Sequence, residues 1–237
     1  MAIHLLKLIE RHQAAKNTLV LVFEKPAGFS FKPGQYGGFT LVNPTEQDAS
    51  GNTRRFSLLS SPDDAHLSIA TRIQQSTYKK MLMTLPIGGE IKFAGPTGNF
   101  TLHEDASVPA VLIAGGIGIA PFYSMIRYAA QHHSSQGIHL FYGNQTPSDA
   151  AFLNELSTLQ QQLPSLKLIP TMADSDPSWL GETGFITDTM IKKYISDLAA
   201  PLYYLCGSPA MVTALQETLA EMGVDEDRIK VEDFPGY

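Results

Sequence analysis

Residues 110–121 read Ala-Val-Leu-Ile-Ala-Gly-Gly-Ile-Gly-Ile-Ala-Pro, and a helix-prone segment follows directly. An apolar, strand-like run therefore ends in three glycines within four positions, at Gly115, Gly116 and Gly118. At such a turn, backbone N–H groups and a helix N-terminus can face an anion, and glycine allows a phosphate to approach closely. Pro121 suits the first helical turn, where its missing N–H is not needed. The stretch predicts a phosphate-binding loop, with a strand-to-helix turn that merely needs glycine as the alternative.

From residue 110 onward, strand-like runs alternate with helix-like segments, the pattern of a parallel sheet covered on both faces. We expect strands over residues 111–114, 138–142, 166–171, 202–205 and 228–233, and helices over 121–131, 149–161, 188–198 and 210–222. Ligands of such sheets bind outside the carboxyl ends of the strands. The turns at 115–121, 143–146 and 206–211 all fall at that edge, so the sequence predicts one site there.

The first hundred residues differ, because short apolar or alternating runs are separated by Pro, Gly and polar residues. This pattern is typical of a small β-barrel or sandwich. We expect strands over residues 5–9, 18–23, 38–42, 66–73 and 90–94, with a polar loop at 43–53 and a helix beginning near residue 76. The polar stretch 101–109 marks a boundary. The predicted domains are therefore 1–101 and 108–237.

Composition argues against several classes of function. The 237 residues carry a net charge of −6 with mixed signs, and no basic stripe is present to neutralise a nucleic-acid backbone. One cysteine, Cys206, allows no intramolecular disulfide and no four-cysteine zinc or iron–sulfur site. No spacing of His and carboxylates indicates a bound metal. Lacking a signal-peptide pattern and an apolar run of about 18 residues, the chain is expected to be cytoplasmic without a membrane span.

Residues 54–57 read Arg-Arg-Phe-Ser. Arginine offers a fork that matches phosphate, and an aromatic ring can lie against a planar group. An exposed edge strand with solvated arginines is the alternative. Ser76 or Thr77 is a candidate helix N-cap whose neighbouring N–H groups suit a second phosphate, or a residue that only caps. Cys206 is either a small buried hydrophobe or a nucleophile.

Together these motifs resemble, in the expected order, those of the ferredoxin–NADP reductase superfamily. The resemblance extends from about residue 30 to the C-terminus. It is carried by Pro-Gly-Gln-Tyr at 33–36, Arg-Arg-Phe-Ser at 54–57, Gly-Pro-Thr-Gly-Asn-Phe at 95–100, the glycine loop at 115–121 and Cys-Gly-Ser-Pro-Ala-Met at 206–211. It implies an N-terminal antiparallel six-stranded β-barrel that binds FAD. A C-terminal α/β doubly wound parallel sheet would bind the nicotinamide cofactor.

The resemblance also implies roles for individual residues. Arg54 would hold the FAD pyrophosphate, Phe56 would lie against the isoalloxazine ring, and Ser57 would hydrogen-bond near flavin N5. Further flavin-binding positions would be Tyr36, Thr71, Ser76 and Thr77. The nicotinamide cofactor would be held by Gly115, Gly116, Gly118, Pro121, Gly143, Gln145, Cys206, Gly207 and Met211, with Ser57 and Cys206 beside the reacting rings. We further hypothesise that Phe234 or Tyr237 brackets the flavin and that Tyr237 covers the face that nicotinamide must reach.

The implied activity is that of an FAD-dependent NAD(P)H oxidoreductase, which passes hydride from nicotinamide to bound FAD. Electrons then leave to a separate ferredoxin, flavodoxin, other redox protein or small molecule, since one cysteine cannot ligate a cluster. A flavin reductase that uses free flavin and an electron-transfer subunit of a larger complex are the alternatives. NADH is favoured over NADPH because residues 143–146 carry no base for a 2′-phosphate, and Lys167 is the only Lys or Arg between Arg127 and Lys192.

Overall fold

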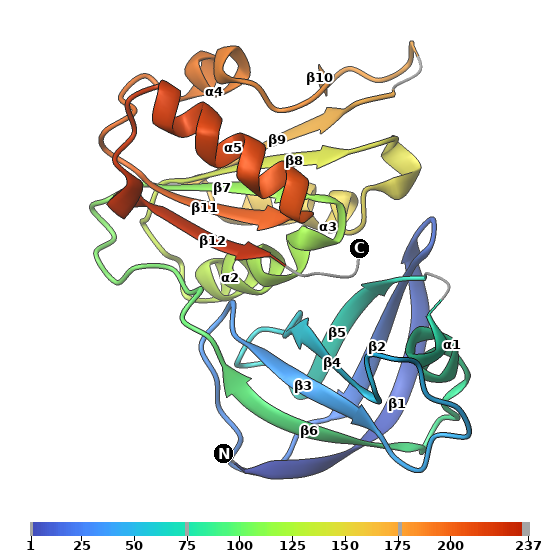
Figure 1. Ribbon diagram of the computed structural model, residues 1–237. Helices are drawn as coiled ribbons and strands as arrows, with labels where there is room; N and C mark the ends of the chain where they lie inside the picture. The colour runs from blue at the N-terminus through green and yellow to red at the C-terminus, as the bar shows by residue number, and fades with distance from the viewer. Residues whose placement is uncertain (1, 74–75, 175–176, 234–237) are drawn as a thin grey trace.

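The computed structural model describes residues 2–73, 76–174 and 177–233. The chain forms two six-stranded sheets, one after the other in sequence. The first is antiparallel and the second is parallel (Figure 1). The N-terminal barrel and the doubly wound α/β sheet predicted from the sequence are therefore confirmed. No helix among the described residues is long and apolar enough to cross a membrane.

The first sheet is built from β1 (Ile3–Ala15), β2 (Thr18–Glu24), β3 (Tyr36–Leu41), β4 (Thr53–Ser57), β5 (His66–Arg72) and β6 (Glu90–Thr97). These strands pair in the order β4-β3-β6-β1-β2-β5, and the sheet curls so that β4 and β5 come close together. Alternate residues of β3 and of the first half of β1 point inward, as Leu6 and Leu8 do on β1. Helix α1 (Thr77–Thr84) packs on this core through Tyr78 and Leu82.

The second sheet consists of β7 (Ala110–Gly115), β8 (Ile138–Asn144), β9 (Leu166–Met172), β10 (Glu182–Thr183), β11 (Leu202–Gly207) and β12 (Ile229–Asp233). Their order is β10-β9-β8-β7-β11-β12. Both faces of the central strand β7 are buried: Leu112 packs with one helical layer, and Val111 and Ile113 pack with the other. A continuous apolar strand is thus explained by helices on both faces.

The helices of the second sheet are α2 (Ile119–Gln131), α3 (Leu153–Gln162), α4 (Asp188–Tyr194) and α5 (Pro209–Glu221), with short 3₁₀ turns η1 (Gly116–Gly118), η2 (Pro147–Asp149) and η3 (Glu226–Arg228). Residues of α2 and α3 contribute to one core, and residues of α4 and α5 contribute to the other. Ser208 caps α5 by accepting a hydrogen bond from the Met211 N–H. Ser76 caps α1 by accepting from the Lys79 N–H, which confirms it as the N-cap.

Three predicted bounds differ from those in the structure by four residues or more. Strand β1 continues to Ala15 because its polar second half pairs with β2, placing His12 opposite Val20. Helix α3 begins at Leu153, four residues later than expected, because Phe152 takes a left-handed conformation with φ of 61°. Helix α4 ends at Tyr194 rather than at residue 198.

Candidate functional site

The glycine loop, residues 115–118, leaves β7 and enters α2 through the η1 turn. A Cβ added at Gly118 would lie 2.3 Å from the carbonyl oxygen of Cys206, and one at Gly115 would lie 2.2 Å from Sδ of Met211. Gly116 has φ of +52°, which L side chains rarely adopt. Close backbone explains Gly118, the Met211 side chain explains Gly115 and the positive φ explains Gly116, and the loop packs directly on the turn that follows β11. Pro121 lies buried in the first turn of α2.

Two adjoining cavities open beside the glycine loop at the carboxyl ends of the strands. Their volumes are about 620 and 400 Å³, and the larger falls within the range of small-molecule and cofactor sites. Four residues line both cavities: Arg72, Gly116, Ser208 and Met211. Gly143 and Gln145 line the larger one. The three turns that the sequence placed at one edge therefore share a connected space.

Asn144 also lines the larger cavity and was not singled out from the sequence. Asn144 is only 8% exposed, and neither atom of its side-chain amide has a hydrogen-bond partner in the described part of the chain. A buried amide without partners is costly, so this side chain is suited to a polar group of a ligand. The signal for Asn144 in the sequence was a polar residue at the end of a predicted strand, directly after a glycine.

The charge of the larger cavity is balanced. Arg72 and Asp149 are the charged residues among those that line it. The Arg72 guanidinium donates to the backbone oxygens of Asp149 at 3.0 Å and of Lys16 at 2.9 Å, and it lies 3.9 Å from the Asp149 carboxylate. Arg72 comes from β5 and Asp149 from η2, so this contact joins the barrel to the α/β sheet.

Two further buried polar groups face this seam, one from each sheet. Ser57 ends β4, opposite Tyr36 on β3, and its buried hydroxyl has no hydrogen-bond partner within the described ranges. The same holds for Oε2 of Glu232 on β12. Burial raises the pKa of Glu232 to about 7, the charge of Asp233 adds to the rise, and the nearby Ser57 hydroxyl opposes it. These groups are therefore placed to receive a polar ligand.

Glu232 was missed by the sequence analysis. It pairs with Cys206 in the parallel register of β11 and β12, which places it at the same strand edge as the glycine loop. A carboxylate near the carboxyl end of the last strand was the available signal, but the stretch 228–233 was considered only as a strand.

Arg54, the predicted phosphate ligand, is occupied by groups of its own chain. Its Nη2 lies 2.5 Å from Oδ1 of Asp48, and its Nη1 donates to backbone oxygens in the loop that precedes β4. The other carboxylate oxygen of Asp48 accepts from the Tyr78 N–H at 3.4 Å, in the first turn of α1. The Asp48 carboxylate thus bridges Arg54 and the start of α1, at the place where the sequence predicts the flavin phosphates.

The other predicted flavin positions differ in exposure. Phe56 is buried, with its ring 5.8 Å from that of Phe39 and 6.1 Å from that of Tyr78. Tyr36 is partly exposed, with the guanidinium of Arg55 5.8 Å from its ring centre. Thr71 is buried in β5, and Thr77 is the first residue of α1. Phe234 and Tyr237 lie outside the described residues. The roles of all these residues remain predictions.

Cys206 is fully buried where β11 ends. Burial raises the pKa of its thiol well above the usual value, and the charges of Glu232 and Asp233 act in the same direction. The side chain is therefore held as a neutral thiol, and the reading as a small buried hydrophobe is favoured over that of a nucleophile. The adjacent Gly207 lies close to Met211, since a Cβ on it would be 2.8 Å from Sδ.

Comparison with known proteins places this geometry in context. Residues 112–217 match the model of the oxidoreductase NAD-binding domain. The reductase component of propane 2-monooxygenase from Rhodococcus jostii is 31% identical over 219 residues, covering 89% of this chain and 57% of that protein. The ferredoxin–NAD(P)+ reductase component of the naphthalene 1,2-dioxygenase/salicylate 5-hydroxylase systems of a Ralstonia species is 30% identical, covering 89% of this chain and 62% of that protein.

Among solved structures, the Amycolatopsis cytochrome P450 reductase GcoB superposes with a TM-score of 0.83 at 27% identity. The match covers 98% of this chain and 70% of that one. The chain spans less than two thirds of the length of the two curated relatives. The similarity therefore includes both sheets but not the remainder of those proteins.

Proposed function

Because this chain belongs to the ferredoxin–NADP reductase-like superfamily, we propose that it is an FAD-dependent NAD(P)H oxidoreductase that passes electrons to a separate acceptor. The observation that carries this proposal is the seam between the two sheets. There the Ser57 hydroxyl of the barrel and Oε2 of Glu232 on β12 have no hydrogen-bond partner among the described residues, and the glycine-lined cavities open at the same strand edge as Glu232. The two related reductase components suggest a ferredoxin or oxygenase component as the acceptor.

FAD and a nicotinamide dinucleotide fit the chemistry of these residues. When bound, the flavin accepts a hydride from nicotinamide and can release electrons singly. The glycine loop and the N-terminus of α2 would hold the pyrophosphate of the dinucleotide. Asn144 would satisfy its buried amide on the dinucleotide, and Arg54 and the first turn of α1 would hold the flavin phosphates.

The protein's own contribution at the reacting centre is orientation and polarity. Ser57 and Glu232 supply a hydroxyl and a carboxyl group that lie near each other, and Oε2 of Glu232 has no hydrogen-bond partner among the described residues. Near pH 7 the Glu232 carboxyl is partly protonated, so it can donate or accept a hydrogen bond. Cys206, as a neutral thiol, contributes packing rather than charge.

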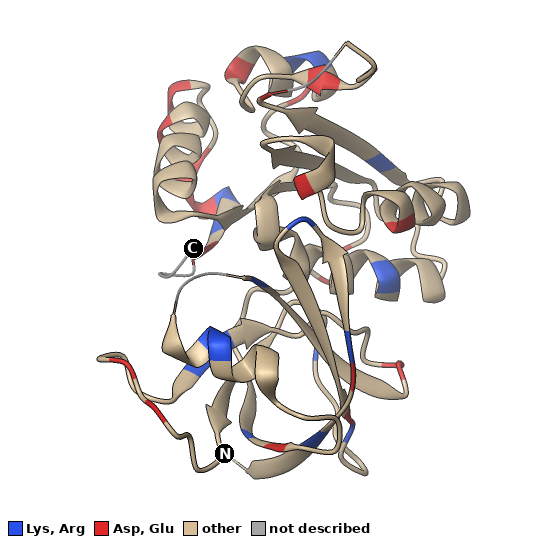
Figure 2. Cartoon of the chain, turned by 90° about the vertical axis from the view of Figure 1, so that its right-hand side faces the viewer, with Lys and Arg blue, Asp and Glu red and all other residues tan. Residues whose placement is uncertain are grey.

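We propose NADH rather than NADPH as the preferred reductant. Arg72 is the cationic residue that lines the larger cavity, and its charge is already balanced by Asp149 and two backbone oxygens. A 2′-phosphate would enter this space without a free counter-charge, whereas a ribose 2′-hydroxyl would not require one. Figure 2 shows Lys and Arg in both domains, interspersed with Asp and Glu.

The decisive experiment is stopped-flow reduction of the FAD-loaded protein by each nicotinamide. We expect bleaching of the flavin absorbance with NADH and a lower kcat/KM with NADPH. A protein that binds no FAD, or that is reduced by neither nicotinamide, would disprove the proposed function.

Use of free flavin as a substrate is a second candidate, supported by the contact between Asp48 and Arg54. A carboxylate at the predicted phosphate site would weaken retention of FAD. Gel filtration of the FAD-loaded protein separates the two candidates. Flavin that co-elutes with the protein supports a bound cofactor, and flavin that is lost on the column supports turnover of free flavin.

A further inference from the structure

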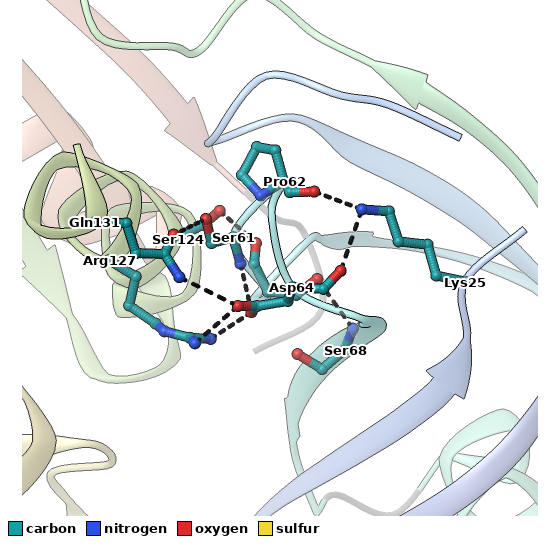
Figure 3. Close-up of polar contacts among 9 residues, drawn as sticks. Lys25, Ser61, Pro62, Asp64, Ser68, Ser124, Arg127 and Gln131 are labelled. Carbon is teal, nitrogen blue, oxygen red and sulfur yellow. Dashed lines mark hydrogen bonds and ion pairs between the residues drawn. The ribbon is translucent and has the colours of Figure 1, made fainter. Parts of the chain in front are cut away.

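One face of α2 is joined to the barrel by a row of polar contacts. Ser124, Arg127 and Gln131 are spaced three and four residues apart and therefore share a face of the helix. All three bond to the seam loop, which we define as residues 58–65 between β4 and β5 (Figure 3). The Ser124 hydroxyl donates to the Ser60 carbonyl oxygen at 2.6 Å, in a fully buried position.

The central contact is a two-pronged ion pair between Arg127 and Asp64. Nη1 and Nη2 of Arg127 lie 2.5 and 2.9 Å from the two carboxylate oxygens of Asp64. The side chains are 30% and 18% exposed, so solvent screens this pair less than it screens a surface pair. A bidentate guanidinium–carboxylate contact fixes direction as well as distance, which a lysine in the same place would not do.

The seam loop is in turn fixed to the barrel. Leu58 and Leu59 are buried, and their N–H groups donate to the carbonyl oxygens of Gln35 and Ser68 at 2.9 and 2.8 Å. Lys25 donates to the backbone oxygens of Pro62 and Asp64, as Figure 3 shows. The Asp64 carboxylate also accepts from the Ser61 N–H at 2.9 Å. Asp64 therefore presents its carboxylate from a loop with little freedom of its own.

Each of the two segments joined by this ion pair continues, along the chain, into a part of the candidate site. Ser57 immediately precedes the seam loop, and the glycine loop immediately precedes α2. Nine residues of helical rise separate Gly118 from Arg127, about 14 Å along a rigid rod. The position of Arg127 is therefore linked through one rigid helix to that of the glycine loop.

From this geometry we propose that Asp64 and Arg127 are positioning residues for hydride transfer. Neither side chain is among those that line the two cavities. The pair sets the angle and distance at which a nicotinamide held by the glycine loop meets a flavin held beside Ser57. This inference rests on the proposed function. Its physical reason is the steep dependence of such a reaction on the geometry of the bound partners.

The test compares Arg127→Met, Arg127→Lys and Asp64→Asn with the wild-type protein, each loaded with FAD. In stopped flow with saturating NADH, we expect the limiting rate of flavin reduction to fall on the order of 10- to 100-fold in Arg127→Met. Arg127→Lys should retain an intermediate rate, because it keeps the charge and loses the fork. The dissociation constants of FAD and NADH should change by less than about 3-fold, because the substitutions are expected to alter the relative orientation of the two bound cofactors rather than their affinity.

A second measurement does not depend on activity. In the flavin-free protein, amide hydrogen exchange of residues 58–65 and 119–131 should accelerate in Arg127→Met and Asp64→Asn. Asp63→Asn is the matched control. It removes the charge of Asp63 from the neighbouring seam contact to His132, at 2.7 Å, in which both side chains are about half exposed. We expect wild-type reduction rates from it.

The possible outcomes separate the two proposals. If Arg127→Met and Asp64→Asn unfold at lower temperature but are reduced at the wild-type limiting rate, the pair is only structural and the inference is wrong. Unchanged hydrogen exchange in both segments would overturn it as well. If wild-type protein is not reduced by NADH at all, the proposed function fails instead.

Discussion

At the scale of single residues, Glu232 makes stability depend on pH. Its folded pKa of about 7 lies above its ordinary value of 4.5, so the folded state holds a proton that the unfolded state releases. The stabilisation is present below about pH 4.5 and is lost as the pH rises through 7. Glu232→Gln keeps the neutral form at every pH. The free energy of unfolding of Glu232→Gln minus that of wild type should therefore increase by about 2 kcal/mol from pH 5 to pH 8.

Urea denaturation at several pH values measures this difference. Glu226→Gln, an exposed glutamate in η3, is the control and should follow the wild-type pH dependence. A constant difference between Glu232→Gln and wild type across this range would contradict the assignment.

Asp48 is expected to compete with the flavin phosphates. Because its carboxylate contacts both Arg54 and the first turn of α1, an incoming phosphate must displace it. Asp48→Asn should bind FAD a few-fold more tightly, an effect on the order of 1 kcal/mol for a pair that is partly exposed. Fluorescence titration of FAD gives the dissociation constants.

Riboflavin, which lacks the phosphates, should bind Asp48→Asn and wild type equally. Glu46→Gln changes a more exposed carboxylate of the same loop and should leave FAD affinity unchanged. Weaker FAD binding by Asp48→Asn would show that the carboxylate supports the site rather than competing for it.

At the scale of elements, the turn from β7 to α2 tolerates no side chain at its last glycine. The nearest atoms to a Cβ at Gly118 are all backbone atoms of residues 206 and 207, which cannot rotate away. Gly118→Ala should therefore lower the free energy of unfolding by about 1–3 kcal/mol and weaken NADH binding. Chemical denaturation and NADH titration measure the two effects.

Gly137→Ala is the matched control, since the nearest atom to its Cβ is a Pro109 carbon at 3.9 Å. It should have close to wild-type stability and NADH affinity. Equal stability of the two variants would mean that the loop can shift to accept a methyl group.

Sequence patterns predicted elements best where burial imposes a regular period. The apolar run of β7 and the glycines after it were unambiguous, because a strand buried on both faces leaves no polar positions. The second half of β1 was not recognisable, since its residues face solvent and are held by pairing with β2. The late start of α3 depends on the left-handed Phe152, a tertiary effect with no local signal.

The site shows the same division. The glycine loop and the turn after β11 were predicted, because close backbone approach requires a recognisable residue type. Glu232 and Asn144 were not, since a polar residue at a strand end becomes informative only when its burial and lack of partners are visible. Asp48 lies in a polar loop, and no local pattern could have placed it against Arg54.

At the scale of the whole molecule, the two sheets are held together at more than one place. Arg72 and Lys16 of the barrel contact η2 at one end of the seam, and the seam loop contacts α2 at another. Contacts at separate points resist hinge motion better than a single linker would. The candidate site between these points is therefore part of a preorganised structure.

Because Cys206 is fully buried, chemical labelling of its thiol can measure how often the native structure opens locally. The chain has one sulfhydryl, and it is fully buried near the carboxyl end of β11 in the parallel sheet. A maleimide reagent should therefore modify the native protein only when β11 separates from its neighbours, at a rate set by that opening equilibrium. Mass spectrometry of samples quenched over time would give the opening free energy directly. Saturating nicotinamide should slow the labelling, whereas instant modification would show that the sheet edge is permeable.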